Sequence, residues 1–252
     1  MAATAAPPKV EPRQLRALFV SVFLDSASFN FLTAVTPAML LTMSDGDLQS
    51  TSNSLAQMSA LSAAVEFVLN PAFGGLSDWL GRLPFLLVSP ACTVLLRGLV
   101  AWRPTRLGVI FGHVICAALG GRYGGNAFMN AGAYPMINDC FVTPHDRADY
   151  FARLTSVAGL GAMLGPVVGA ALARRGERLP FVVAVTMGAL NLILLGTTLK
   201  ETLPPSRVKR FRFTGLNPLS FLALFNPRHK YNTQTNGAVR RVSTRATPTT
   251  TT

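Results

Sequence analysis

Residues 74–82 read GGLSDWLGR and join two long apolar stretches, 55–76 and 84–102. Glycines allow two helix ends to approach closely. Asp78 and Arg82 carry opposite charges four residues apart, so they can pair with each other or with neighbouring helix ends. The stretch therefore predicts a tight, charged turn between two hydrophobic helices, with an ordinary Gly/Asp turn as the alternative.

Working outward from this turn, further apolar stretches follow one another along the chain. A helix needs about 20 apolar residues to cross the hydrocarbon core of a bilayer. Six stretches are of this kind: 15–41, 55–76, 84–102, 107–138, 153–173 and 180–199. The fourth is read as one irregular helix, with two short helices as the alternative. Half of the residues are hydrophobic and 13% are charged, and soluble domains carry about 25% charged residues. The sequence predicts an all-α membrane protein with six transmembrane helices.

Charge is distributed unevenly along the chain. Residues 1–199 carry 13 Lys or Arg and 10 Asp or Glu, whereas residues 200–252 carry 10 and one. The basic end contains no recognisable nucleic-acid-binding motif, so we expect it to contact an anionic lipid leaflet and not nucleic acid. We expect a cytoplasmic N-terminal tail, a six-helix transmembrane domain, a basic amphipathic cytoplasmic linker and a disordered polar tail: 1–14, 15–200, 201–228 and 229–252.

The loops also predict the orientation of the chain. With the N-terminus in the cytoplasm, the inner segments carry eleven Lys or Arg and the outer turns carry five. Because cytoplasmic loops of membrane proteins are enriched in these residues, a multi-pass protein with both termini in the cytoplasm is expected.

Charged residues inside the apolar stretches are candidates for a functional site. Asp25 lies within the first span, Glu66 near the middle of the second and Arg122 in the fourth. A charged side chain in the bilayer core is costly, so such residues usually face a cavity or a partner. Asp25 is the first candidate for proton coupling or cation recognition, Glu66 is a second, and Arg122 is their candidate basic partner. Structural hydrogen bonding remains the alternative for both acids.

Small residues recur at a spacing of four in the fifth span. Gly161, Gly165 and Gly169 fall on one face of a helix, and Pro166 follows the second of them. Another helix can pack closely against such a face, and the proline removes a hydrogen bond and allows a bend. This pattern predicts a helix-packing site.

These motifs together resemble those of the major facilitator superfamily. Residues 74–82 are similar to its signature loop, although Trp79 and Leu83 replace basic residues that the family often has. The glycine–proline pattern is similar to a motif of the drug/proton antiporter branch. The surroundings of Asp25 are similar to the acidic first-helix motif of tetracycline/proton exporters, and residues 139–151 to the polar loop after the fourth span. The resemblance implies the N-terminal six-helix half of the family's fold, with a cytoplasmic gating loop formed by Gly74, Asp78, Gly81 and Arg82.

The function that this resemblance implies is secondary transport. We expect a half or truncated transporter for proton-coupled export of small organic molecules, with the lipid bilayer, protons, a small organic substrate and a second six-helix half or a homodimer as its partners. The alternatives are a non-transporting membrane interaction or regulatory protein, and a fragment of a mis-predicted full-length transporter. No catalytic triad, phosphate-binding loop or metal-ligand spacing occurs, so we expect no enzyme, cofactor or metal.

Overall fold

The computed structural model describes residues 11–118, 132–141 and 143–203. The described residues form eight α-helices and one π-helical turn, η1. In chain order these are α1 Pro12–Thr42, α2 Leu48–Leu80, α3 Arg82–Cys92, η1 Thr93–Arg97, α4 Gly98–Trp102, α5 Arg106–Ala118, α6 Tyr134–Cys140, α7 Pro144–Ala173 and α8 Leu179–Thr198. The predicted all-α class is confirmed.

The helix ends follow from local sequence. Pro12 and Pro144 occupy the first turns of α1 and α7, where a missing N–H costs nothing. The Thr143 hydroxyl accepts a hydrogen bond from the Asp146 backbone N–H at 3.1 Å, which caps α7. The turn after α1 uses Asp45 and Gly46, both with positive φ.

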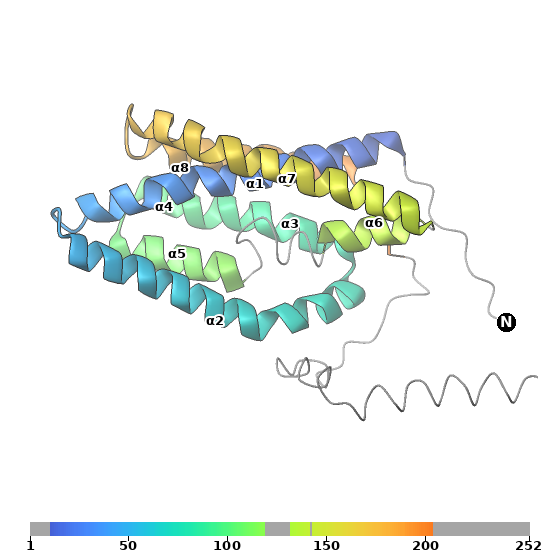
Figure 1. The fold of residues 1–252 in the computed structure, drawn as a ribbon, viewed down its shortest axis with the longest axis horizontal. Coiled ribbons are helices and arrows are strands. Elements are labelled where there is room, and N and C mark those ends of the chain that lie inside the picture. Colours follow the sequence, from blue (N-terminus) through green and yellow to red (C-terminus); the bar gives the residue numbers. More distant parts are fainter. Residues whose placement is uncertain (1–10, 119–131, 142, 204–252) are drawn as a thin grey trace, which may run out of the picture.

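The helices lie along a common direction in a bundle (Figure 1). The long helix α1 packs against both α7 and α8, which lie far from it in sequence. On the other side of the bundle α2 packs against α5, and α3 packs against α8. Helix α1 therefore packs closely against α7 and α8, and it makes a smaller contact with α2.

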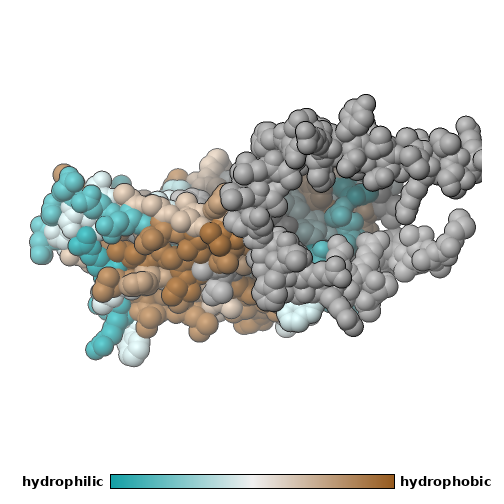
Figure 2. All heavy atoms as spheres, turned by 90° about the horizontal axis from the view of Figure 1, so that it is seen from below, coloured by the Kyte–Doolittle hydropathy of each residue, from teal (hydrophilic) through white to brown (hydrophobic). Residues whose placement is uncertain are grey.

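Four segments are long and apolar enough to cross a membrane: Pro12–Thr42, Arg82–Trp102, Pro144–Ala173 and Leu179–Thr198. They correspond to the first, third, fifth and sixth predicted spans. Helix α2 has 33 residues, about 50 Å at the usual helical rise, but Ser, Thr and Asn near its start lower its hydropathy. Figure 2 shows an apolar band over the middle of the bundle and hydrophilic side chains at one end.

The count of six spans is therefore confirmed only in part. The fourth predicted span, 107–138, is divided between α5 and α6, with residues 119–131 outside the described part. The predicted linker and tail, 201–228 and 229–252, lie outside it from residue 204 onward.

The boundaries of two predicted loops were wrong. Residues 74–80 are helical and belong to the last two turns of α2, so the expected turn shrinks to Gly81. The reason is that nothing between Gly74 and Leu80 stops a helix, whereas Gly81 has φ +102° and no other residue type adopts that angle easily. The expected loop 139–151 is also short, because Pro144 already begins α7.

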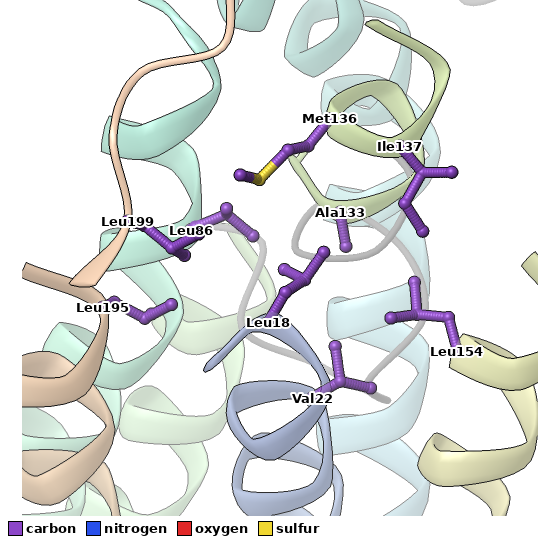
Figure 3. Packing of buried hydrophobic residues seen from close by; sticks show 9 residues of the cluster. All are labelled: Leu18, Val22, Leu86, Ala133, Met136, Ile137, Leu154, Leu195 and Leu199. Atoms are coloured by element: carbon purple, nitrogen blue, oxygen red, sulfur yellow. The ribbon is translucent and has the colours of Figure 1, made fainter. Parts of the chain in front are cut away.

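One cluster of buried side chains holds the end of the bundle that contains the α2–α3 junction (Figure 3). It unites five segments of the chain, and its members are Leu18, Val22, Leu86, Ala133, Met136, Ile137, Leu154, Leu195 and Leu199. A second cluster lies toward the other end and includes Leu40, Met58, Val100 and Ala184. The polar residues of the candidate site lie between these two clusters.

Candidate functional site

Asp25 is buried in the middle of α1, with 7% of its surface exposed. The Ser89 hydroxyl of α3 donates a hydrogen bond to Asp25 Oδ1 at 2.6 Å. The Ser28 hydroxyl donates to the Asp25 backbone carbonyl at 3.0 Å. Charged groups are rarely buried without hydrogen bonds, and this carboxyl has a partner on a neighbouring helix.

Arg97 is the charged residue for which the structure gives an interaction with this acid. It ends the π-helical turn η1, and its charge interacts with the Asp25 carboxyl. Its Nη1 donates to the Ser28 carbonyl at 3.2 Å. Its guanidinium lies over the Phe29 ring, 5.5 Å from the centroid. A cation on an aromatic face is stabilised by the ring's quadrupole, more so when water is excluded.

Arg97 is not among the site residues predicted from the sequence, although its signal is present there. It lies inside the predicted span 84–102, and the argument applied to Asp25 and Glu66 applies equally to a buried guanidinium. Its interaction with Asp25 could not be read from sequence, because it depends on how η1 lies against α1.

A cavity of about 180 Å³ lies beside Arg97. Its walls come from α1, α2, η1, α4, α5 and α8. The lining residues are mainly apolar, with hydroxyl groups from α1 and α2, and they are Phe29, Leu32, Thr33, Thr36, Pro37, Leu55, Met58, Ser59, Leu96, Arg97, Val100, Val109, Gly112, His113, Cys116 and Phe181. Asp25 is not one of them, whereas Arg97, whose charge interacts with it, is.

The structure describes only one of the other two predicted site residues. Glu66 is half-buried on α2 and does not belong to the described lining of the cavity. Arg122 lies outside the described residues, so its expected pairing with an acid stays a prediction. The roles proposed for both residues also stay predictions.

A charged junction forms where α2 ends and α3 begins. Arg82 is 8% exposed. Its guanidinium pairs with Asp78 at 2.7 Å and with Asp139 of α6 at 3.2 Å. It also donates to the Ser77 hydroxyl at 2.6 Å. A buried guanidinium with two carboxylates and a hydroxyl has most of its donors satisfied, which offsets the cost of removing it from water.

Glu201 completes the junction from beyond the end of α8. Its two carboxylate oxygens accept hydrogen bonds from the backbone N–H groups of Arg82 and Leu83, both at 3.0 Å. A carboxylate at the first amides of a helix is stabilised by the helix dipole. A Cβ at Gly81 would overlap this carboxylate, so Gly81 supplies both the positive φ and the room for Glu201. Gly74 lies in α2 below the junction, and its surroundings are not described.

The glycines of α7 lie against the backbone of α1. A Cβ at Gly161 would lie 2.9 Å from the Ala27 nitrogen, and one at Gly169 would lie 2.5 Å from the Phe31 carbonyl oxygen. All three glycines of the motif are buried, and Pro166 follows within the same helix. Side chains at these positions would force the two helices apart.

Known proteins resemble this chain in sequence and in fold. The sequence pattern of the Major Facilitator Superfamily matches residues 18–240. The chain belongs to this superfamily. Among relatives, it is 30% identical over 200 residues to the tetracycline resistance protein, class C, of Escherichia coli, covering 79% of this chain and 48% of that protein. It is 25% identical to the quinolone resistance protein NorA of Staphylococcus aureus (strain MRSA252), covering 72% and 44%.

Two solved superfamily structures share the fold. The human organic anion transporter MFSD10 (TETRAN) aligns with a TM-score of 0.68 at 20% identity, over 85% of this chain and 55% of that one. The peptide transporter POT in complex with sulfate aligns with a TM-score of 0.63 at 21% identity, over 95% and 47%. The chain thus spans about half the length of the curated relatives it matches. The predicted resemblance to the drug/proton antiporter branch of the superfamily is confirmed.

Proposed function

We propose that this chain forms the N-terminal half of a superfamily transporter that exports small organic molecules in exchange for protons. The observation that carries the proposal is the buried Asp25, which is held by Ser89 and interacts with Arg97, whose guanidinium borders a largely apolar cavity. A proton on Asp25 changes the charge beside Arg97, and Arg97 faces the space that a substrate would fill. Proton and substrate thereby act on one pair of side chains.

The relatives support export of small molecules. Two of them are named for resistance to tetracycline and to quinolones, and resistance is an outcome that export of these compounds would produce. The lining of the cavity suits a small organic molecule, because ligand sites combine apolar walls with a few polar groups that fix orientation.

Transport also requires a second wall. Alternating access closes a midplane site from one side at a time, and it needs two six-helix units that rock against each other. This chain supplies one such unit in our proposal, and the other comes from a second six-helix half or from a second copy of the chain. The lipid bilayer and protons are the remaining partners.

We further propose that the junction of Asp78, Arg82, Asp139 and Glu201 is part of a cytoplasmic gate, and that both termini face the cytoplasm. The ion pairs of Arg82 join α2, α3 and α6. The hydrogen bonds of Glu201 tie the start of α3 to the segment after α8. These charged groups at one end of the bundle can hold the helix ends together in one state of the transporter. They can release the helix ends in another state, when the two halves move.

The experiment compares two proteins in cells that lack their own efflux pumps. One is the 252-residue chain, and the other is the longest reading frame that contains it. The longer protein should export a fluorescent organic substrate, and a protonophore should stop the export, whereas the 252-residue chain should not export. Export by the longer protein that ignores the protonophore would refute proton coupling. Protonophore-sensitive export by the 252-residue chain alone, with no cross-linked dimer, would refute the need for a second wall.

A further inference from the structure

The cavity has a distinct electrostatic character. Of its sixteen described lining residues, Arg97 alone carries a permanent charge, and no carboxylate is among them. Asp25 is not among them, and its Oδ1 accepts a hydrogen bond from Ser89 of α3. An organic cation that entered would therefore meet a fixed positive charge and no described anionic group on the wall. An anion would meet a guanidinium between largely apolar walls, where such an interaction is stronger than in bulk water.

Arg97 has hydrogen-bonding capacity left for a ligand. A guanidinium has five N–H donors. Within the described residues its hydrogen bonds go to the Ser28 carbonyl and the Cys116 thiol. The remaining donors can form a fork that matches the two oxygens of a carboxylate.

The backbone places Arg97 at this spot by a departure from regular helix. Residues 93–97 form a π-helical turn inside an otherwise α-helical span. Such turns occur often at functional sites, because they change the direction in which the following side chains point. Helix α8 packs closely against this turn. Gly188 of α8 leaves no room for a side chain, because a Cβ there would lie 3.0 Å from a methyl group of Thr93.

The size and walls of the cavity restrict what can accompany the anionic group. A volume of about 180 Å³ is close to the ~150 Å³ of an apolar cavity that admits benzene. Phe29 and Phe181 supply aromatic walls, and Ser59 supplies a hydroxyl donor. The hydroxyls of Thr33 and Thr36 already donate to backbone carbonyls of α1. A single ring with one carboxylate fits these dimensions, and a larger molecule would extend through the open side.

We infer that this cavity selects aromatic organic anions and that Arg97 anchors their carboxylate. The inference rests on the proposed transport function for its biological meaning, and it concerns the charge class of the substrate. Arg97 is in this view a residue that determines specificity.

The test measures ligand binding to the 252-residue chain in lipid nanodiscs, without any ion gradient. Three probes of nearly equal size differ in charge: benzoate, benzamide and benzylammonium. Benzoate should bind at least tenfold more tightly than benzylammonium, with benzamide between them. Arg97→Gln should weaken benzoate binding by about 10- to 100-fold, because hydrogen bonds to charged groups contribute that much.

Two further variants give the control and the gradation. Arg97→Lys keeps the charge but loses the planar fork, so it should weaken benzoate binding less than Arg97→Gln. Arg103→Gln removes an exposed cation at the end of α4, outside the cavity lining, and should leave all three affinities unchanged. Unchanged benzoate affinity in Arg97→Gln, or tighter binding of benzylammonium than of benzoate, would overturn the inference.

A second measurement covers the case in which Arg97→Gln does not fold. Cys116 lines the cavity and contacts Arg97. In a Cys92→Ser, Cys140→Ser background, benzoate should slow the alkylation of Cys116, and benzylammonium at the same concentration should not. Equal protection by both probes would refute charge selection. Export by the longer reading frame without benzoate binding would refute this inference alone, whereas benzoate binding without export would refute only the proposed function.

Discussion

The two sides of α1 are built in opposite ways. On the α7 side, Gly161, Gly165 and Gly169 bring two backbones together, and any added carbon would collide with Ala27, Asn30 or Phe31. On the α2 and α5 side, the same helix borders a cavity and carries Asp25, whose carboxyl interacts with the charge of Arg97. The face of α1 toward α7 leaves no space for added side chains and carries no charged group. The face toward α2 and α5 borders the cavity and carries Asp25.

This difference suggests a division of labour within one helix. In a bilayer the hydrophobic effect does not drive helices together, so close packing of small residues has to hold α1 to α7. Once α1 is held there, its other face can carry buried polar groups that would by themselves weaken the bundle. Changes on the first face should therefore affect stability, and changes on the second should affect function.

The clearest way to break this comparison is to remove the titratable group from the functional face. In the longest reading frame that contains this chain, Asp25→Asn should abolish protonophore-sensitive efflux, because an amide cannot take up and release a proton. Membrane insertion should remain normal, since Asn still accepts the hydrogen bond from Ser89. Efflux assays and membrane-fraction blots measure the two properties. Asp45→Asn, at an exposed acid in the turn after α1, should have no effect. Uphill export by Asp25→Asn at the normal rate would remove Asp25 from the mechanism.

A bulky residue in the α1–α7 contact should cause the greatest loss of stability. In Gly165→Leu the new Cβ would lie 2.5 Å from that of Asn30. We expect a loss of about 3 kcal/mol or more, because overpacking costs 1–3 kcal/mol even where neighbours can shift. Thermal unfolding in detergent measures it. Gly159→Leu is the matched control on the same helix, since nothing lies within 4 Å of its Cβ position. Equal melting temperatures of the two variants would mean that α7 does not pack on α1 in this way.

The junction offers a third region in which a glycine and a charge depend on each other. Gly81→Ala should destabilise the protein by about 2 kcal/mol, because positive φ costs other residues 1–2 kcal/mol and the methyl group would displace Glu201. Gly176→Ala, which meets no atom within 4 Å, should change the melting temperature little. A neutral result for Gly81→Ala would show that the Glu201 carboxylate does not lie over this residue.

The smallest step compares the two faces with the same substitution. Gly161→Ala, on the α7 side, should lower stability by about 1 kcal/mol, because the backbone of Ala27 cannot move away easily. Gly112→Ala, in the cavity wall, meets neighbours only at 3.9 Å or beyond and should be neutral or stabilising by about 0.5–1 kcal/mol. Chemical or thermal unfolding measures the stability of both variants. A Gly112→Ala variant less stable than Gly161→Ala would refute the contrast between the two faces of α1.

Local sequence determined several of these features. The apolar length of the spans predicts a membrane bundle, since the thickness of the bilayer sets the length of its helices. Acid and base four residues apart across a tight glycine turn predict the ion pair of Asp78 and Arg82, because a short turn keeps such residues close together. The spacing of Gly161, Gly165 and Gly169 predicts a face for close helix packing. Each of these depends on residues near one another in the chain.

The tertiary structure alone decided which side chains from different segments of the chain contact one another. The sequence could not show that Ser89 and Arg97 meet Asp25, that Asp139 joins Arg82, or that Glu201 covers the start of α3, because these residues come from different helices. Nor could it show the π-helical turn at Arg97, which depends on packing against α8 as well as on local preference. Within a helix, periodicity sets the neighbours of a side chain. Between helices they depend on how closely small residues let the backbones approach, and that is a property of the packed bundle.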